Sequence, residues 1–85
     1  MGYDFEKVVE RVSELFHVEK GYITGKGRQK AGVQAMDLLC YWAVVELGTP
    51  MVDLARKFDI TPAAVSYAVQ RGEKMVRELG YQLET

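Results

Sequence analysis

The clearest chemical feature of this sequence is a cluster of cations suited to binding phosphate. Residues 20–36 contain four basic and no acidic residues, a net charge of +4, carried by Lys20, Lys26, Arg28 and Lys30. The whole chain has a net charge of −1, so the remaining segments are acidic. Glycines on both sides of Lys26 predict an exposed loop rather than regular structure. Basic side chains in such a loop can neutralise the phosphates of a nucleic acid.

A second set of residues is suited to touching base pairs. Helical spacing predicts that Val65, Val69 and Val76 face the core from the last predicted helix. The opposite face, at the start of that helix, then carries small and polar side chains, namely Thr61, Pro62, Ala63, Ser66, Tyr67 and Gln70. We expect this face to be exposed, and its small side chains would let the helix backbone approach a ligand closely.

Several of these residue types match groups in the major groove of DNA. Ala63 can contact a thymine methyl group, and Ser66 and Gln70 can hydrogen-bond base edges. Phosphate contacts are expected from Tyr67, Arg71 and Lys74. A purely structural role for Ala63 stays open, because alanine is also the strongest helix former.

The apolar pattern predicts an all-α fold without strands. Apolar side chains recur at three and four residues, and the expected helices cover about 4–16, 30–47, 50–58 and 62–79. With 85 residues, we expect one small domain over residues 1–85, built from about four to five helices. The second of these helices is apolar on nearly all sides, including Val45, and is expected at the centre. Asp4 can cap the first helix, and Leu79 is expected to face the core from the last.

The last two helices have the spacing of a helix-turn-helix. This motif needs a small residue where its helices cross, here Ala55, and a residue that tolerates a sharp turn, here Asp59. Its apolar positions are filled by Leu54, Phe58, Ile60, Val65 and Val69. Thr49 and Thr61 each precede a proline, and we expect them to cap the two helices.

Enzymatic and metal-dependent chemistry is not indicated. His17 and Cys40 are the only residues of their types, too few for a metal site, which typically needs three or four ligands. His17 is expected at the end of the first helix and Cys40 in the core. Carboxylates are expected on solvated faces, without the paired arrangement of acid–base catalysis. We therefore expect no enzyme activity, metal, cofactor or small-molecule ligand.

The number of cysteines also indicates the cellular compartment in which the protein is expected. A single cysteine cannot form an internal disulfide, which favours a reducing, cytoplasmic setting. No apolar run approaches the roughly 18 residues of a membrane span, and no secretory leader is recognisable. We therefore expect no membrane partner.

Two stretches of the sequence resemble a known DNA-binding domain. They are "LLCYWAVVELG" at residues 38–48 and "DLARKFDITPAAVSYAVQRGEK" at residues 53–74. Both resemble the carboxy-terminal domain of REP-associated tyrosine transposases, which is itself similar to the DNA-binding domain (domain IV) of the bacterial replication initiator DnaA. The resemblance implies that Lys26, Arg28 and Lys30 reach the minor groove beside the helix-turn-helix.

The sequence also departs from both families. DnaA carries Asp-His-Thr-Thr where this chain has Thr61-Pro62-Ala63-Ala64, so recognition of the DnaA site is not expected. The transposases have a catalytic domain with paired histidines, which the single histidine here cannot supply. We therefore expect an excised carboxy-terminal domain or a stand-alone relative.

These observations predict sequence-specific binding of double-stranded DNA by a helix-turn-helix and a basic loop. Two alternatives stay open. Residues 1–19 carry two basic and five acidic groups, which favours a protein-interaction module. A stand-alone transcription regulator would be expected to form a homodimer that reads two half-sites. The basic segment discriminates between these classes, because a DNA reader needs its charge and a scaffold does not.

Overall fold

Four helices make up the described part of the chain, and they confirm the predicted all-α class. The computed structural model describes residues 4–17 and 30–81, with side chains from residue 34 onward in the second range. The helices are α1 (Phe5–Phe16), α3 (Lys30–Val45), α4 (Met51–Phe58) and α5 (Pro62–Leu79). These two ranges contain no strand. None of the four helices is both long and apolar enough to cross a membrane.

Local sequence explains where α1 and α5 begin. The Asp4 carboxylate accepts a hydrogen bond of 2.9 Å from the Lys7 backbone N–H. The Thr61 hydroxyl accepts one of 3.1 Å from the Ala64 backbone N–H. Each bond satisfies a backbone donor that has no partner within its own helix, and both capping predictions are confirmed. His17 ends α1 in the left-handed conformation, with a φ of 55°.

The junction between α3 and α4 differs from the expectation. The α3 helix ends at Val45, two residues early, and α4 begins at Met51, one residue late. Pro50 is the N-terminal cap of α4, and no side chain caps this helix, so the prediction of a Thr49 cap is wrong. The Thr49 backbone N–H instead donates to the Ala43 carbonyl oxygen at 2.9 Å. This bond ties Thr49 to the end of α3 and away from the start of α4.

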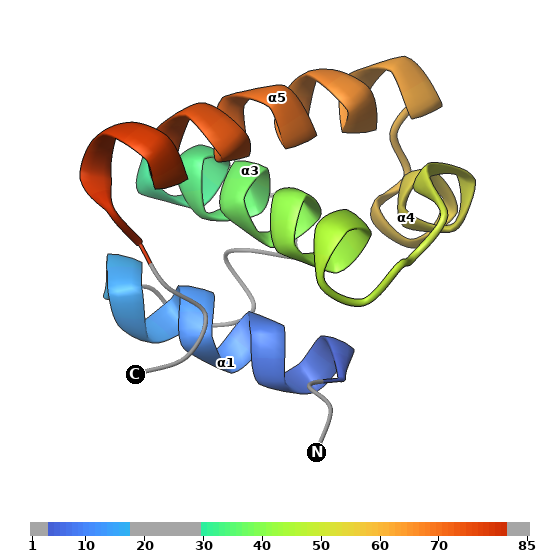
Figure 1. The fold of residues 1–85 in the computed structure, drawn as a ribbon. Coiled ribbons are helices and arrows are strands. Elements are labelled where there is room, and N and C mark those ends of the chain that lie inside the picture. The colour runs from blue at the N-terminus through green and yellow to red at the C-terminus, as the bar shows by residue number, and fades with distance from the viewer. Residues whose placement is uncertain (1–3, 18–29, 82–85) are drawn as a thin grey trace.

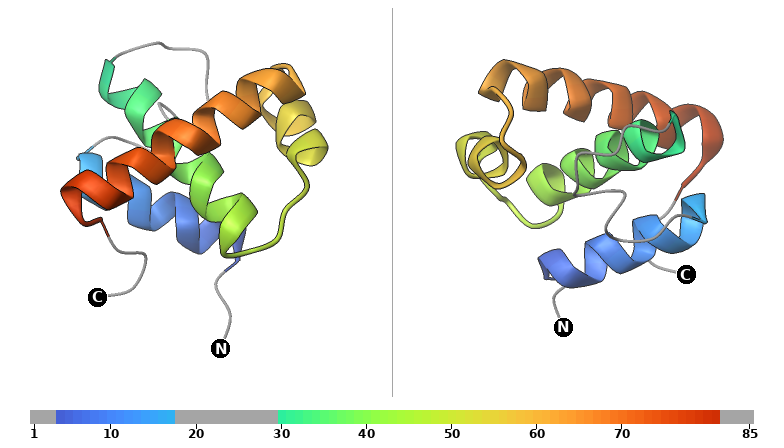
Figure 2. Two further views of the ribbon diagram at one scale, coloured as in Figure 1. Left: turned by 45° about the horizontal axis from the view of Figure 1, so that its top comes forward. Right: turned by 180° about the vertical axis from the view of Figure 1, so that it is seen from behind.

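The α3 helix lies at the centre of the fold, as its apolar sequence predicted. It passes between α1 and α5, while α4 lies at one end of the α3–α5 pair (Figure 1). Two further views show the same order of helices (Figure 2). Because α3 faces helices on two sides, Leu38, Leu39 and Ala43 have no exposed surface. Val45 is the last residue of the helix and is 52% exposed, so the apolar face of α3 is not covered along its whole length.

Two clusters of buried side chains attach the other helices to α3. One includes Val8 from α1 and Leu38 from α3. The other includes Cys40 from α3, Leu54 from α4 and Val65 from α5. Met75 of α5 also packs against the first cluster and Phe5 of α1 against the second, so the two clusters together join all four helices.

The α5 helix comes very close to α3 at Gly72. A Cβ atom placed on Gly72 would lie 2.6 Å from the Cβ of Tyr41 and closer still to the carbonyl oxygen of Asp37. Side-chain carbons do not approach their neighbours so closely, so this crossing requires glycine. The buried face of α5 ends before Leu79, which is 64% exposed, and the prediction that Leu79 faces the core is wrong.

Candidate nucleic-acid interface

A sharp turn connects α4 to α5. Asp59 ends α4 in the left-handed conformation with a φ of 57°, which aspartate tolerates better than most residues. The Ile60 backbone N–H donates to the Ala55 carbonyl oxygen at 2.9 Å and closes the turn over the end of α4. Thr61 then caps α5, which begins at the next residue. The prediction of a sharp turn at Asp59 is confirmed.

The apolar residues predicted to hold α4 against α5 belong to one cluster. Leu54, Ala55 and Val65 are buried within it, at 1%, 5% and 0% exposed. Phe58, Ile60 and Val69 are half-buried and pack against the same cluster. This packing fixes the orientation of α4 relative to the start of α5.

The start of α5 presents a largely exposed and uncharged surface. We call it the α5 surface, and it consists of Thr61, Pro62, Ala63, Ser66, Tyr67 and Gln70. Five of these residues are exposed and Ser66 is half-buried. Tyr67 is the most prominent, because its large side chain is 61% exposed. Residues 60–70 contain no charged side chain, so this surface would not repel the bases or the backbone of DNA.

Two cations border the α5 surface. Arg71 lies four residues after Tyr67, and Lys74 lies three residues after Arg71. These spacings make the three side chains neighbours on one side of a helix. Both cations are exposed, so the structure gathers them beside the residues expected to touch base edges.

The predicted basic loop lies mostly outside the described residues. Lys26 and Arg28 fall between the two described ranges. Lys30 is the first residue of α3, and its side chain is not described. The expected roles of these three cations therefore stay predictions.

Arg71 is joined to a carboxylate from α3. Its Nε donates to Asp37 Oδ2 at 2.9 Å, and its Nη2 donates to Asp37 Oδ1 at 3.0 Å. The Asp37 side chain is 7% exposed, whereas the Arg71 side chain is 58% exposed. The hydrogen bond to Asp37 is the main reason that the pKa of Arg71 lies above its ordinary value.

This pair corrects the expectation that carboxylates lie on solvated faces. Asp37 is buried within the apolar α3 helix, where an ionised carboxylate requires a partner. The sequence does indicate that Asp37 needs a partner, because an aspartate within an apolar helix must either be solvated or pair with a cation. Its partner stands 34 residues away in the sequence and could not be identified from spacing.

Cys40 lies in the core, as predicted, and its thiol resists ionisation. Burial is the main cause that raises the pKa of the thiol to about 12, the Asp37 carboxylate raises it further, and Arg71 opposes the shift. A thiol that stays protonated is a poor nucleophile and a poor metal ligand. The described residues also contain no group of three metal-binding side chains.

We expect the thiol to make stability fall at high pH. The pKa of the thiol is 9.0 in the unfolded chain and about 12 in the folded protein. Between these two pH values, only the folded state keeps the proton on the thiol. This contribution is complete below pH 9 and is lost as pH rises toward 12, by up to about 1.4 kcal/mol per pH unit. Urea unfolding of wild type and Cys40→Ala at about pH 7 to 10 measures the effect. A difference between the two proteins that stays constant with pH would contradict it.

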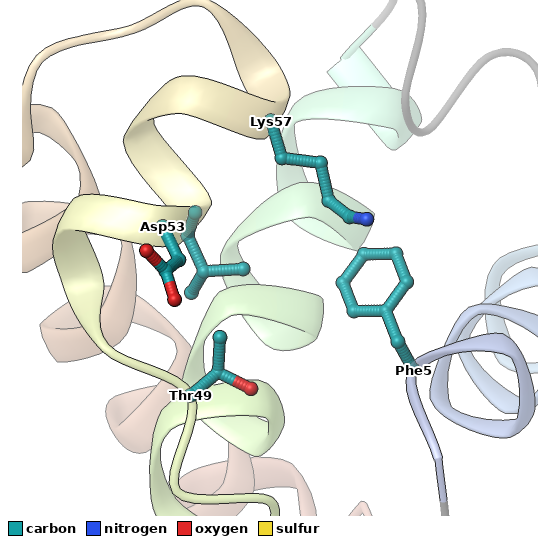
Figure 3. Close-up of a pocket in the computed structure, with 5 residues that line it drawn as sticks. Phe5, Thr49, Asp53 and Lys57 are labelled. Carbon is teal, nitrogen blue, oxygen red and sulfur yellow. The ribbon is translucent and has the colours of Figure 1, made fainter.

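A shallow pocket lies between the start of α1 and α4 (Figure 3). Its volume is about 240 Å³, and it is lined by Phe5, Thr49, Asp53, Leu54 and Lys57. The Lys57 Nζ lies 4.6 Å from the centre of the Phe5 ring, a favourable cation–π distance. The same ring lies 6.0 Å from the ring of Phe58. These contacts brace α4 against α1. They join helices that are distant in the sequence, so helical spacing alone does not reveal them.

The structure defines a small all-helical domain in which a sharp turn joins α4 to α5, and the start of α5 presents an exposed, uncharged surface beside Arg71 and Lys74. No protein-family model, curated protein or solved structure matches the chain. The resemblance to the transposase and DnaA domains therefore rests on the quoted residues alone.

Proposed function

We propose that this chain binds double-stranded DNA in a sequence-specific manner, with α4 and α5 acting as a helix-turn-helix. The observation that carries this proposal is the exposed, uncharged α5 surface beside Arg71 and Lys74. In a helix-turn-helix, the start of the second helix lies in the major groove. Ala63 allows close approach and can contact a thymine methyl group, while Ser66 and Gln70 supply groups that hydrogen-bond base edges.

The placement of charge supports the same orientation. The α1 helix lies on the far side of α3 from α5 (Figure 1), and its exposed residues include Glu6 and Glu14. A duplex against α5 would therefore be separated from this acidic helix by α3. Phosphate contacts would come from the α5 side chains Tyr67, Arg71 and Lys74, and from the basic segment that contains Lys26, Arg28 and Lys30.

The resemblance of residues 38–48 and 53–74 to the transposase and DnaA domains makes the proposal more specific. It favours a DNA-binding domain of a transposase or of a protein similar to a replication initiator. Such a role fits the cytoplasmic setting expected from the single cysteine. A stand-alone transcription regulator would instead be a homodimer that reads two half-sites, so sedimentation of the complex with selected DNA separates these two forms of the proposal.

The test is binding of the purified protein to a pool of random duplexes, followed by selection. Wild type should enrich one DNA sequence. Gln70→Ala should lose about 1–3 kcal/mol of binding free energy at one base position, because a single base contact is removed. Glu14→Ala is the control, since Glu14 is exposed on α1, and it should change the preference at no base position. Absence of DNA affinity even at low salt would contradict the proposal.

The same experiment at several salt concentrations tests the basic segment. Arg28→Ala should weaken binding to most sequences. Lys26→Ala or Lys30→Ala should reduce the salt slope by about one, as expected for one lost phosphate contact. Lys7→Ala is the control, because Lys7 lies on α1 with 65% of its side chain exposed. If the loop variants bind as well as wild type, the loop is not part of the interface.

A protein-interaction module is the second candidate. The α5 surface carries no charge, and Tyr67 on α5 and Val52 on α4 are both large and at least half exposed, at 61% and 50%. Aromatic side chains are enriched at protein interfaces. Failure of the wild type to bind DNA would make this the leading function.

A further inference from the structure

We infer that Asp37 is a positioning residue that holds the Arg71 guanidinium in place to bind a phosphate of the DNA backbone. This inference rests on the proposed function and assigns one defined contact within it. Its basis is the two-bond pair that joins a buried carboxylate on α3 to an exposed guanidinium on α5.

The geometry divides the guanidinium into an inner and an outer side. The inner side donates through Nε and Nη2 to the two oxygens of Asp37. An arginine has five N–H donors, so three of them are not needed by the carboxylate. The Arg71 side chain is 58% exposed while that of Asp37 is 7% exposed. The pair therefore turns its negative end toward the core and its positive end toward solvent.

The pair also fixes a side chain that would otherwise be mobile. Arginine has many rotamers, and ordering them on binding opposes association. Here the two hydrogen bonds to a buried partner impose that order when the chain folds. Lys74 lies one turn further along α5 and is exposed, and no ion pair or hydrogen bond to it is among those found in the described residues. The two cations thus differ in how strongly they are held in position.

The position of Arg71 along α5 suits a phosphate at the edge of the major groove. A helix rises about 1.5 Å per residue, so Arg71 lies roughly 12 Å along the axis from Ala63. The major groove is about 12 Å wide. A helix that places Ala63 among the bases, and whose axis crosses the groove, would therefore carry Arg71 toward the backbone, on the side of α5 that also bears Tyr67.

Three variants test the inference, each measured by affinity for the selected duplex at several salt concentrations. Arg71→Gln should weaken binding and reduce the salt slope by about one. Asp37→Asn keeps the cation, so the slope should stay near the wild-type value, while affinity should fall roughly two- to tenfold because Arg71 must be ordered on binding. Removing a negative charge would by itself favour DNA binding, so a loss of affinity identifies positioning. Lys74→Gln should reduce the slope as Arg71→Gln does.

The control for folding is the double variant Asp37→Asn with Arg71→Gln, which leaves no buried charge without a partner. It should fold and show the same reduced slope as Arg71→Gln. All measurements are made at a temperature where circular dichroism shows each variant to be folded. If folded Arg71→Gln keeps the wild-type slope, or Asp37→Asn binds as tightly as wild type, the pair only joins α3 to α5. Wild type that binds no duplex would overturn the proposed function itself.

Discussion

Replacing Leu54 with alanine is expected to lower the free energy of unfolding by about 2–5 kcal/mol. Leu54 is 1% exposed, and it is one of the two buried residues of the short α4 helix, the other being Ala55. Truncation would leave a cavity where α4 meets α3 and α5. Urea unfolding followed by circular dichroism measures the loss.

The control for this prediction is Val52→Ala in the same helix. Val52 is 50% exposed, so its truncation should change stability by about 0.5 kcal/mol or less. If Leu54→Ala were as mild as Val52→Ala, α4 would not be anchored by its buried face. DNA binding should decline with Leu54→Ala as α4 loosens, because the helix-turn-helix proposal needs α4 to hold the start of α5.

Replacing Gly72 with alanine is expected to destabilise the protein by about 1–3 kcal/mol. The added carbon would meet the backbone of Asp37 and the Cβ of Tyr41, neither of which can rotate away. The helices α3 and α5 would have to separate, which would also strain the contact between Asp37 and Arg71. Chemical unfolding and the thermal midpoint measure the change.

The sign of the change in the free energy of unfolding is informative. The clash with α3 lowers this free energy, whereas the higher helix propensity of alanine raises it. Alanine is about 1 kcal/mol more favourable than glycine inside a helix, so a gain of that size would show that α3 and α5 are not in close contact. Gln70→Ala is the control, since Gln70 is exposed on the same helix. It should change stability by about 0.5 kcal/mol or less.

The sequence by itself determined the features that depend on near neighbours in the chain. The helices follow from apolar side chains spaced by three and four residues, and two of their starts follow from Asp4 and Thr61, whose side chains reach a backbone N–H three residues away. Asp59 was recognisable as the turn because few residues tolerate positive φ. The exposed face at the start of α5, including Tyr67 and Gln70, follows from the same helical spacing.

Only the tertiary structure decided which helices meet and how closely. Asp37 and Arg71 stand 34 residues apart. The spacing of apolar residues within α3 or α5 does not show that the other helix crosses it at this point. The need for glycine at position 72, and the contact of Phe5 with Phe58, arise from the same crossings. Periodicity shows which face of a helix is buried, but the partner on that face is set by the packing of the whole chain. The residues of the proposed interface could therefore be predicted from the sequence, whereas the pairing of Asp37 with Arg71 could not.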